Sequence, residues 1–361
     1  MKRKDKLDRR MSKEDAEDAM TGKVKIYGTL GPACGTEDIL KRMFEEGMDG
    51  VRLNLSHVTL DEAADDIEVY HRAAAACGMG GELLIDMQGP ELRIGKLDEP
   101  REFMIGEVIE PDSIPFPGEV LEFISGGRRG IDILLDDGKI MLRTELAGGG
   151  TDVPGDFGIK LRVIRGGLLE SKKSVAVAGL AIDTPPMTEA DLENISKAKE
   201  YGVTGVMQPF VRGASDLIAV RKALDEAGCG DVKLLGKIEN LEGMAALDEI
   251  IPCCDEVVIA RGDLGNSMDL WELPAAQKRI SATCRAAGRD FLVVTQMLDS
   301  MNVRQVPTRA EVSDIFNAVL DGASSVMLTG ETAAGENPIF SIRYMARTVR
   351  AAEEYLRELE K

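Results

Sequence analysis

The sequence contains only two histidines, His57 and His71, among 361 residues. This scarcity argues against a Ser-His-Asp mechanism and against a histidine-rich zinc site. The six cysteines form no C-x-x-C pair, which favours reduced, packed thiols over a metal site. Basic residues are also few, with 44 Lys and Arg against 63 Asp and Glu, so neither nucleic acid nor an anionic membrane surface is expected as a partner. No segment has the apolar length of a signal peptide or a membrane span, and we predict a cytoplasmic protein.

The residues that are present are typical of a globular protein, with 44% hydrophobic and 30% charged positions. The length suits one large domain with an insertion, or two domains. The net charge of −19 means that a site for anionic substrates would need a local positive pocket, which proteins often build with metal ions. Residues 1–22 are hydrophilic and are predicted to form a disordered or loosely helical tail.

Beyond residue 23, apolar strand-like segments alternate with amphipathic helical segments. The predicted strands are 24–30, 50–56, 82–87, 205–210, 232–235, 256–260, 291–297 and 324–329. Predicted helices follow them, with Thr36 as an N-cap, Gly47 as a stop and a capping box at Thr188. Eight strand–helix pairs predict a (β/α)8 TIM barrel. A doubly wound open sheet is the alternative, but no G-x-G-x-x-G follows the first strand.

The alternation breaks between residues 95 and 178, where short runs are interrupted by Gly, Pro and charge. The Asp137-Gly138 pair between apolar runs predicts a hairpin. We therefore predict that 95–178 is a small all-β domain inserted after the third strand. The barrel would then comprise 23–94 and 179–361.

Charged residues gather where the predicted strands end. Lys237 and Glu239 are separated by one residue and therefore leave the strand on the same face. Arg52, Asn54 and Ser56 likewise share one face of the second strand. The charged run 261–263 ends the next strand after Glu239, so a polar site is predicted at one end of the barrel. A solvated ion pair is the simpler interpretation of Lys237 and Glu239 alone.

Several motifs at these strand ends together resemble the pyruvate kinase family over residues 23–336. In chain order, they read G-T-L-G-P at 28–32, R-L-N-L-S-H at 52–57, D-M-Q-G-P-E-L-R at 86–93, S-K-K at 171–173 and F-V-R at 210–212. The series continues with K-I-E-N at 237–240, A-R-G-D-L-G at 260–265, T-Q-M at 295–297, P-T-R-A-E-V-S-D at 307–314 and L-T-G-E-T-A at 328–333. The resemblance implies a phosphotransferase of glycolysis, which transfers the phosphoryl group of phosphoenolpyruvate to ADP and protonates the enolate to pyruvate.

The resemblance also implies residue roles. Glu239 and Asp263 would bind Mg²⁺ or Mn²⁺. Lys237 would stabilise the transferring phosphoryl group and the enolate, and Arg52 would bind the phosphate. Thr295 would relay a proton through water. The backbone of Ala260, Arg261 and Gly262 would hold the substrate carboxylate.

Further roles concern K⁺ and the nucleotide. A K⁺ site is implied at Asn54, Ser56, Asp86 and the Met87 carbonyl, although Asn54 and Ser56 could instead cap a loop. Glu91 would make this site more negative and the cation more necessary. Nucleotide contacts are implied for Thr29, Pro32, Asn54, Arg93 and Lys173. The last two would act as the inserted domain closes as a lid, although charges at such hinges are often only solvated. His57 is interpreted as structural.

The sequence departs from the family pattern at 266–269, near the dimer contact that the resemblance implies, and at 175–179, in the implied lid. The additional carboxy-terminal domain of the family is not found before Lys361, so we expect no sugar-bisphosphate activation. A homo-oligomer, with a dimer favoured, is predicted. Two other functions stay open: an aldolase-like carbon–carbon lyase that shares the Glu–Asp metal site, and a non-catalytic metabolite-binding relative. The second would be expected to lose Lys237, Thr295 or a metal ligand, and all are kept.

Overall fold

The computed structural model describes residues 23–56, 58–126, 129–136, 138–146, 158–177, 180, 184–359 and 361. Two compact units are present. The first comprises Met1–Gly89, Pro186–Leu264 and Trp271–Lys361, and the second Pro90–Pro185 with Gly265–Leu270. The predicted tail 1–22 and His57 lie outside the described residues.

The first unit contains a closed parallel barrel in the order β1-β15-β14-β13-β12-β11-β3-β2, which confirms the predicted (β/α)8 fold. Its strands are β1 (Lys25–Thr29), β2 (Gly50–Asn54), β3 (Glu82–Asp86), β11 (Gly205–Gln208), β12 (Lys233–Ile238), β13 (Glu256–Ala260), β14 (Asp290–Val294) and β15 (Ser325–Met327). The open-sheet alternative is excluded because β1 pairs with both β2 and β15.

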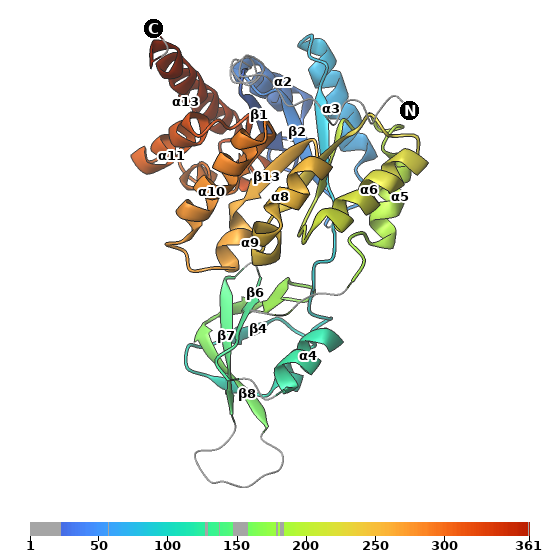
Figure 1. Cartoon of the computed structure of the whole chain (residues 1–361), viewed down its shortest axis with the longest axis vertical. Coiled ribbons are helices and arrows are strands. Elements are labelled where there is room, and N and C mark those ends of the chain that lie inside the picture. Colours follow the sequence, from blue (N-terminus) through green and yellow to red (C-terminus); the bar gives the residue numbers. More distant parts are fainter. Residues whose placement is uncertain are drawn as a thin grey trace. The chain divides into compact units, whose positions relative to one another are not determined.

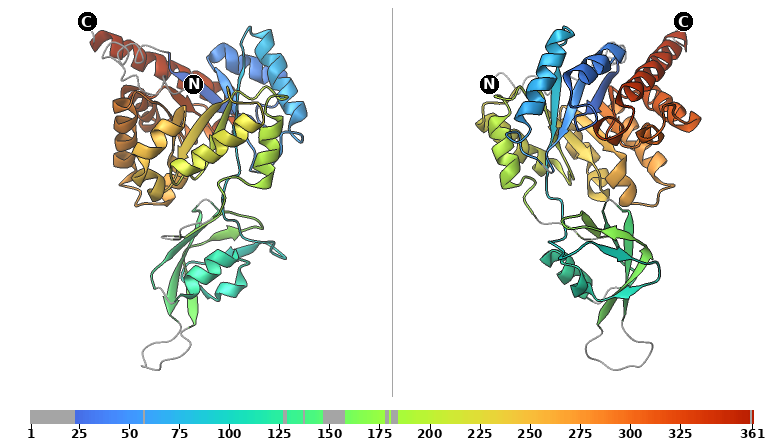
Figure 2. Two further views of the ribbon diagram at one scale, coloured as in Figure 1. Left: turned by 45° about the vertical axis from the view of Figure 1, so that its right-hand side comes forward. Right: turned by 180° about the vertical axis from the view of Figure 1, so that it is seen from behind.

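Helices form the outer layer around these strands (Figures 1 and 2). The longer ones are α2 (Glu37–Glu46), α3 (Ala64–Ala76), α5 (Glu189–Lys197), α6 (Ala214–Glu226), α10 (Leu273–Ala286), α11 (Arg309–Leu320) and α13 (Pro338–Leu359). Shorter ones are α7 (Leu241–Ala245), α8 (Leu247–Ile250), α9 (Arg261–Asn266), α12 (Gly330–Ala333) and the 3₁₀ turns Ile251–Cys253 and Asp299–Asn302. The predicted boundaries at Thr36, Gly47 and Thr188 are confirmed, the last with a complete capping box.

The barrel interior is a buried apolar cluster drawn from every barrel strand except β2: Tyr27, Leu84, Met207, Leu235, Val258, Ala260, Leu292, Val294 and Met327. Alternation along each strand turns these side chains inward and the intervening ones toward the helices. On β2 the inward position at this level is Arg52, which pairs in register with Leu84. A charged side chain in this layer requires a partner, and the partner lies at the carboxyl ends of the strands.

The second unit has a five-stranded sheet in the order β10-β6-β7-β8-β5 and a two-stranded sheet β4-β9. The bounds are β4 (Arg101–Phe103), β5 (Val108–Ile109), β6 (Asp132–Leu135), β7 (Ile140–Leu146), β8 (Ile159–Arg165), β9 (Gly167–Leu169) and β10 (Val175–Val177), with a 3₁₀ turn at Pro111–Ser113. Antiparallel β6 and β7 flank the predicted hairpin, whose Asp137 lies outside the described residues.

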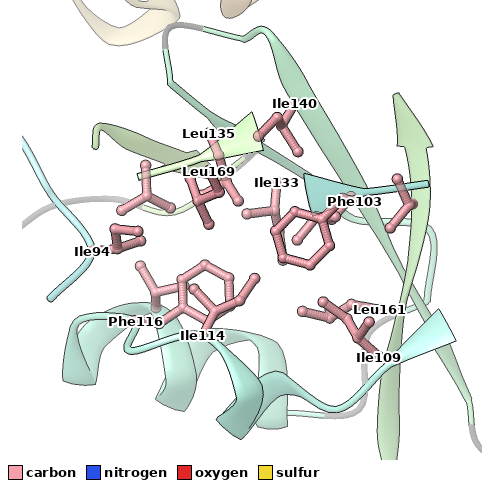
Figure 3. Close-up of a cluster of buried hydrophobic side chains, with 14 of the residues drawn as sticks. Ile94, Phe103, Ile109, Ile114, Phe116, Ile133, Leu135, Ile140, Leu161 and Leu169 are labelled. Atoms are coloured by element: carbon pink, nitrogen blue, oxygen red, sulfur yellow. The ribbon is translucent and has the colours of Figure 1, made fainter. Parts of the chain in front are cut away.

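This unit is not all-β, so that prediction is wrong in one respect. Helix α4 (Gly118–Ser125) places Val120 and Ile124, one turn apart, in the hydrophobic core. Its eight residues lie between Pro117 and Gly126, too short for the periodicity to stand out in the sequence. Figure 3 shows Phe103, Phe116 and Leu161 in the core that this helix helps to cover.

Candidate active site

Four charged side chains meet at the carboxyl ends of β2, β3 and β12. Lys237 Nζ lies 3.1 and 3.2 Å from the two carboxylate oxygens of Asp86 and 2.9 Å from Glu239 Oε1. Arg52 donates to Asp86 Oδ2 from Nε at 3.0 Å and from Nη2 at 2.7 Å. The side chains of Asp86 and Glu239 are only 4% and 1% exposed, so these contacts compensate charges removed from water.

The network fixes the protonation states of its members. Burial by itself raises the pKa of Asp86, but Lys237 and Arg52 outweigh burial, and the net pKa lies below its ordinary value. Burial likewise opposes the Lys237 ammonium, yet Asp86 and Glu239 raise the pKa of Lys237 above its usual range. Lys237 is therefore a cation and Asp86 an anion at neutral pH.

The strand β12 places Lys237 and Glu239 as the sequence predicts. Ile238 between them is fully buried, while Lys237 and Glu239 share the opposite face and touch one another. Glu239 Oε2 also accepts a hydrogen bond from the Phe210 amide at 2.8 Å, in the loop after β11. Phe210 has a positive φ of 51°, an uncommon conformation that turns its N–H toward the carboxylate. The solvated ion pair is excluded as an interpretation, because both side chains are largely buried.

Thr295 follows β14 and is held by Arg261. The Arg261 guanidinium donates to the Thr295 carbonyl from Nη2 at 2.7 Å and from Nε at 3.1 Å, and its Nη1 pairs with Asp314 Oδ2 on α11 at 2.6 Å. Thr295 adopts a φ of 81°, which is costly for a β-branched residue. A Cβ at Gly262 would lie 3.2 Å from Thr295 Cγ2, so the glycine permits the close approach of the two loops.

The predicted divalent-ion ligands are Glu239 and Asp263. Glu239 directly follows β12, and Asp263 lies in the first turn of α9, which follows the neighbouring strand β13. In the described part of the chain, no group of three His, Cys, Asp or Glu side chains is arranged to hold a metal. Two carboxylates nevertheless suit Mg²⁺, which keeps several waters and binds substrate phosphates with few protein ligands. The donor set fits the ion.

The predicted K⁺ ligands lie at the carboxyl ends of β2 and β3 and in the loops that follow them. Asn54 Oδ1 accepts a hydrogen bond from the Ser56 amide at 3.3 Å, and Met87 is buried beside Asp86. Ser56 lies beyond the end of β2 rather than on it, because the strand stops at Asn54. Asp86 already has two cationic partners, so a K⁺ ion would share this carboxylate with Arg52 and Lys237. Oxygen ligands of this kind suit a hard monovalent cation.

The predicted nucleotide ligands are divided between the two units. Thr29 is buried in the barrel wall, where its hydroxyl donates to the Leu328 carbonyl, while Pro32 is exposed. In the second unit, Arg93 pairs with Glu91 at 2.5 Å and Lys173 with Asp136 at 3.1 Å. The predicted effect of Glu91 on the K⁺ site stays a prediction, with Arg93 as a partner of its carboxylate. The nucleotide roles stay predictions.

Three carboxylates with no predicted role hold the loops at the carboxyl ends of the strands. Asp314 fixes Arg261, Asp191 binds the backbone after β3, and Glu331 accepts hydrogen bonds from the Leu298 and Thr329 amides at 3.0 and 2.8 Å. Asp191 belongs to a capping box that is visible in the sequence. Its longer-range contacts are not visible there, because they join segments 102 and 103 positions apart.

All six cysteines are free thiols, and burial raises the pKa of Cys34 to about 11 and of Cys254 and Cys284 to about 12. They are packing residues, as the sequence indicates. Among the described residues, no helix combines the length and hydropathy needed to cross a bilayer.

A (β/α)8 barrel with an ionic site at the carboxyl ends of its strands is the class that this geometry defines. The sequence model of the barrel domain of pyruvate kinase matches residues 21–110 and 119–342. Pyruvate kinase of Bacillus licheniformis is 37% identical over 347 residues, covering 92% of this chain and 58% of that protein. The enzymes of Mycobacterium tuberculosis and Aeropyrum pernix are 35% and 36% identical and are covered over 71% and 70% of their lengths.

The chain belongs to the pyruvate kinase family. It spans less than three fifths of the length of several relatives, including those of Bacillus licheniformis and Geobacillus stearothermophilus at 58% each.

Proposed function

We propose that this protein transfers the phosphoryl group of phosphoenolpyruvate to ADP, giving pyruvate and ATP. The observation that carries the proposal is the buried Lys237 ammonium between Asp86 and Glu239, with Arg52 on the same carboxylate. Phosphoryl transfer between two anions requires preorganised positive charge at the reacting phosphate. Lys237 and Arg52 supply two such charges in an otherwise acidic protein.

The proposed reaction has two steps. A terminal phosphate oxygen of ADP attacks the phosphorus of phosphoenolpyruvate, and the bond between phosphorus and the enol oxygen breaks, leaving the enolate of pyruvate. The electron pair of the enolate then takes a proton at the methylene carbon. Lys237 stabilises the charge on the enol oxygen, and Thr295, through water, delivers the proton. Arg261 and Asp314 position Thr295 through its carbonyl.

The proposal assigns the remaining predicted residues as ligands. Glu239 and Asp263 would hold Mg²⁺ or Mn²⁺, which neutralises phosphate charge when bound. Asn54, Ser56, Asp86 and Met87 would hold K⁺. Ala260, Arg261 and Gly262 would hold the substrate carboxylate. Thr29, Pro32, Asn54, Arg93 and Lys173 would contact ADP, with residues 95–178 acting as a lid. A cytoplasmic homo-oligomer, with a dimer favoured, remains the predicted setting.

The test uses the purified chain with phosphoenolpyruvate, ADP, Mg²⁺ and K⁺, and measures pyruvate and ATP separately. Equal amounts of both products are expected, and no pyruvate without ADP. A second assay follows exchange of the pyruvate methyl protons with deuterium from D₂O, which needs only the barrel site. Consumption of phosphoenolpyruvate or pyruvate without ATP would favour a lyase, and binding without turnover would favour a non-catalytic relative.

A further inference from the structure

One buried carboxylate, Asp191, binds both linkers that join the inserted segment to the barrel. Its Oδ1 accepts a hydrogen bond from the Gln88 amide at 2.8 Å, and its Oδ2 accepts from the Gly89 amide at 3.0 Å. The same Oδ2 accepts from the Thr188 amide at 2.8 Å. Gln88 and Gly89 directly follow β3, and Thr188 directly precedes α5, so three backbone N–H groups from the two linkers converge on one side chain.

A second set of contacts holds the same two linkers on the end of β11. Gly89 has a φ of 62°, and a Cβ there would lie only 2.4 Å from Pro209 Cγ, so this linker is seated directly on Pro209. The side-chain Nε2 of Gln208 donates to the Pro186 carbonyl at 2.8 Å and to the Pro209 carbonyl at 2.9 Å. Asp191 and Gln208 are both fully buried. The linkers are thus anchored by side chains that solvent does not reach.

This anchor is continuous with the ionic site. Met87 donates its amide to the Met207 carbonyl at 3.1 Å, and the Gln88 side chain donates to the Leu55 carbonyl at 3.2 Å. Asp86, which binds Lys237 and Arg52, is only two residues from Gln88. The inserted segment therefore leaves the barrel directly beside the ionic site.

We infer that Asp191 is a positioning residue for phosphoryl transfer: it fixes both linkers at one point and so sets where the inserted segment is attached. This inference rests on the proposed function. In the described part of the chain, no lysine or arginine pairs with Asp191, and its partners are backbone N–H groups. An asparagine has one oxygen and one NH₂ group, so it would direct a donor at a donor and break at least one of the three hydrogen bonds that hold the linkers.

The test compares Asp191→Asn with Asp216→Asn in the full chain. Asp216 is a matched control because it is also a buried carboxylate in the first turn of a helix, α6, where it accepts three hydrogen bonds from Arg212. None of these three hydrogen bonds involves a residue of either linker. Three quantities are measured for each variant: phosphoryl transfer to ADP, exchange of the pyruvate methyl protons, and hydrogen exchange of the amides of Gln88, Gly89 and Thr188.

We expect phosphoryl transfer by Asp191→Asn to fall by on the order of 10²-fold, the loss typical of a small misplacement remote from the chemistry. The KM for ADP should rise, methyl-proton exchange should fall much less, and the three amides should exchange faster. Asp216→Asn should resemble the parent in all three measurements.

The inference is overturned if Asp191→Asn transfers phosphoryl groups as well as Asp216→Asn does. It is also overturned if transfer and methyl-proton exchange fall equally, because that pattern indicates general damage to the barrel. If the folded parent chain itself makes no ATP, the proposed function fails instead. The amide exchange would then still report whether Asp191 holds the linkers.

Discussion

The Lys237 ammonium lies 3.1 Å from Asp86 Oδ1 although β12 and β3 are not neighbours in the barrel, because β11 lies between them. The contact therefore crosses the mouth of the barrel rather than following a strand edge. Because Asp86 holds the Lys237 ammonium in this position, the ammonium does not need to reorient when negative charge develops on the substrate during the reaction.

Replacement of Lys237 tests this arrangement. Lys237→Met should lower turnover by on the order of 10²-fold or more, because a preorganised charge is lost at the transferring group. The matched control is Lys233→Met, at the exposed start of the same strand β12. Steady-state rates of ATP formation are the measurement. Near-parental rates for Lys237→Met at saturating Mg²⁺ would remove Lys237 from the mechanism.

Glu239→Gln should weaken divalent-ion binding while leaving the fold intact. The amide oxygen can still accept the hydrogen bond from Phe210, and Lys237 keeps its contacts with Asp86. The NH₂ group then faces the Lys237 ammonium, and the charge that suits Mg²⁺ or Mn²⁺ is lost. Titration with Mn²⁺, followed by electron paramagnetic resonance, gives the affinity directly. Glu242→Gln, at an exposed position on α7, is the control and should bind like the parent. Unchanged Mn²⁺ affinity in Glu239→Gln would contradict the assignment.

Gly262→Ala should reduce turnover through Thr295. The added Cβ would lie 3.2 Å from Thr295 Cγ2, so the strained Thr295 loop must shift by a few tenths of an ångström. We expect a loss of kcat with a smaller change in the KM for phosphoenolpyruvate. Gly213→Ala is the control, because a Cβ there meets no atom within 4 Å. A parental kcat in Gly262→Ala would show that the spacing of these loops does not matter.

The sequence predicts most of the barrel because each strand and helix has its own periodicity. The eight predicted strands and the helix boundaries at Thr36, Gly47 and Thr188 therefore correspond to elements of the structure, with strand ends that differ by a few residues. The short α4 escapes this reasoning because its core contribution rests on Val120 and Ile124.

The site is predictable in its residue types but not in its pairings. Lys237 and Glu239 are neighbours on one strand, and their contact follows from alternation alone. The contacts of Asp86 with Arg52 and Lys237, and of Asp191 with Gln88, join residues far apart in sequence. They depend on how the barrel closes, and no local pattern contains that information.

The opposite end of the barrel offers a prediction about pH. Glu256, at the start of β13, is buried and accepts hydrogen bonds from Ser325 at 2.5 Å and Ser324 at 3.1 Å. Burial raises the pKa of Glu256, and Asp290 adds to this, while the serines and Lys233 oppose it. The folded protein then binds a proton more tightly than the unfolded chain, so stability falls as pH rises from about 4.3 toward the folded pKa.

Glu256→Gln should therefore flatten that decline. Glutamine keeps an oxygen for the two serines but cannot ionise, so the variant should gain stability relative to the parent at higher pH. Urea unfolding at a series of pH values measures this.

Glu82→Gln should change the pH dependence of stability in the opposite direction. Burial opposes the Glu82 carboxylate, but Lys25 and Tyr27 outweigh burial and lower the pKa of Glu82. That carboxylate stabilises the fold above about pH 4.3, so its loss should destabilise the protein at neutral pH. A parental pH slope in Glu256→Gln would show that Glu256 does not control this range.

Dependence on K⁺ is the prediction in which two charges compete. Asn54, Ser56, Asp86 and the Met87 carbonyl offer oxygen ligands, and activity should rise steeply when K⁺ replaces tetramethylammonium at constant ionic strength. We predict that Glu91 favours this dependence, because its negative charge would increase the need for a cation. Arg93 reduces that effect, since its guanidinium lies 2.5 Å from the Glu91 carboxylate and both side chains are partly buried.

A graded series of variants separates these contributions. If the charge at position 91 sets the need for K⁺, the dependence should decrease from the parent to Glu91→Gln and again to Glu91→Lys, which supplies a positive charge internally. Arg93 already offsets part of the Glu91 charge, so the change from the parent to Glu91→Gln should reduce the K⁺ dependence only a little. The change from Glu91→Gln to Glu91→Lys should reduce it more, because it places a lysine beside Arg93. The measurement is the rate of ATP formation against K⁺ concentration for all three proteins. Full activity of the parent in tetramethylammonium would refute the K⁺ requirement, whereas equal dependence in all three would show that the charge of Glu91 does not act on the site.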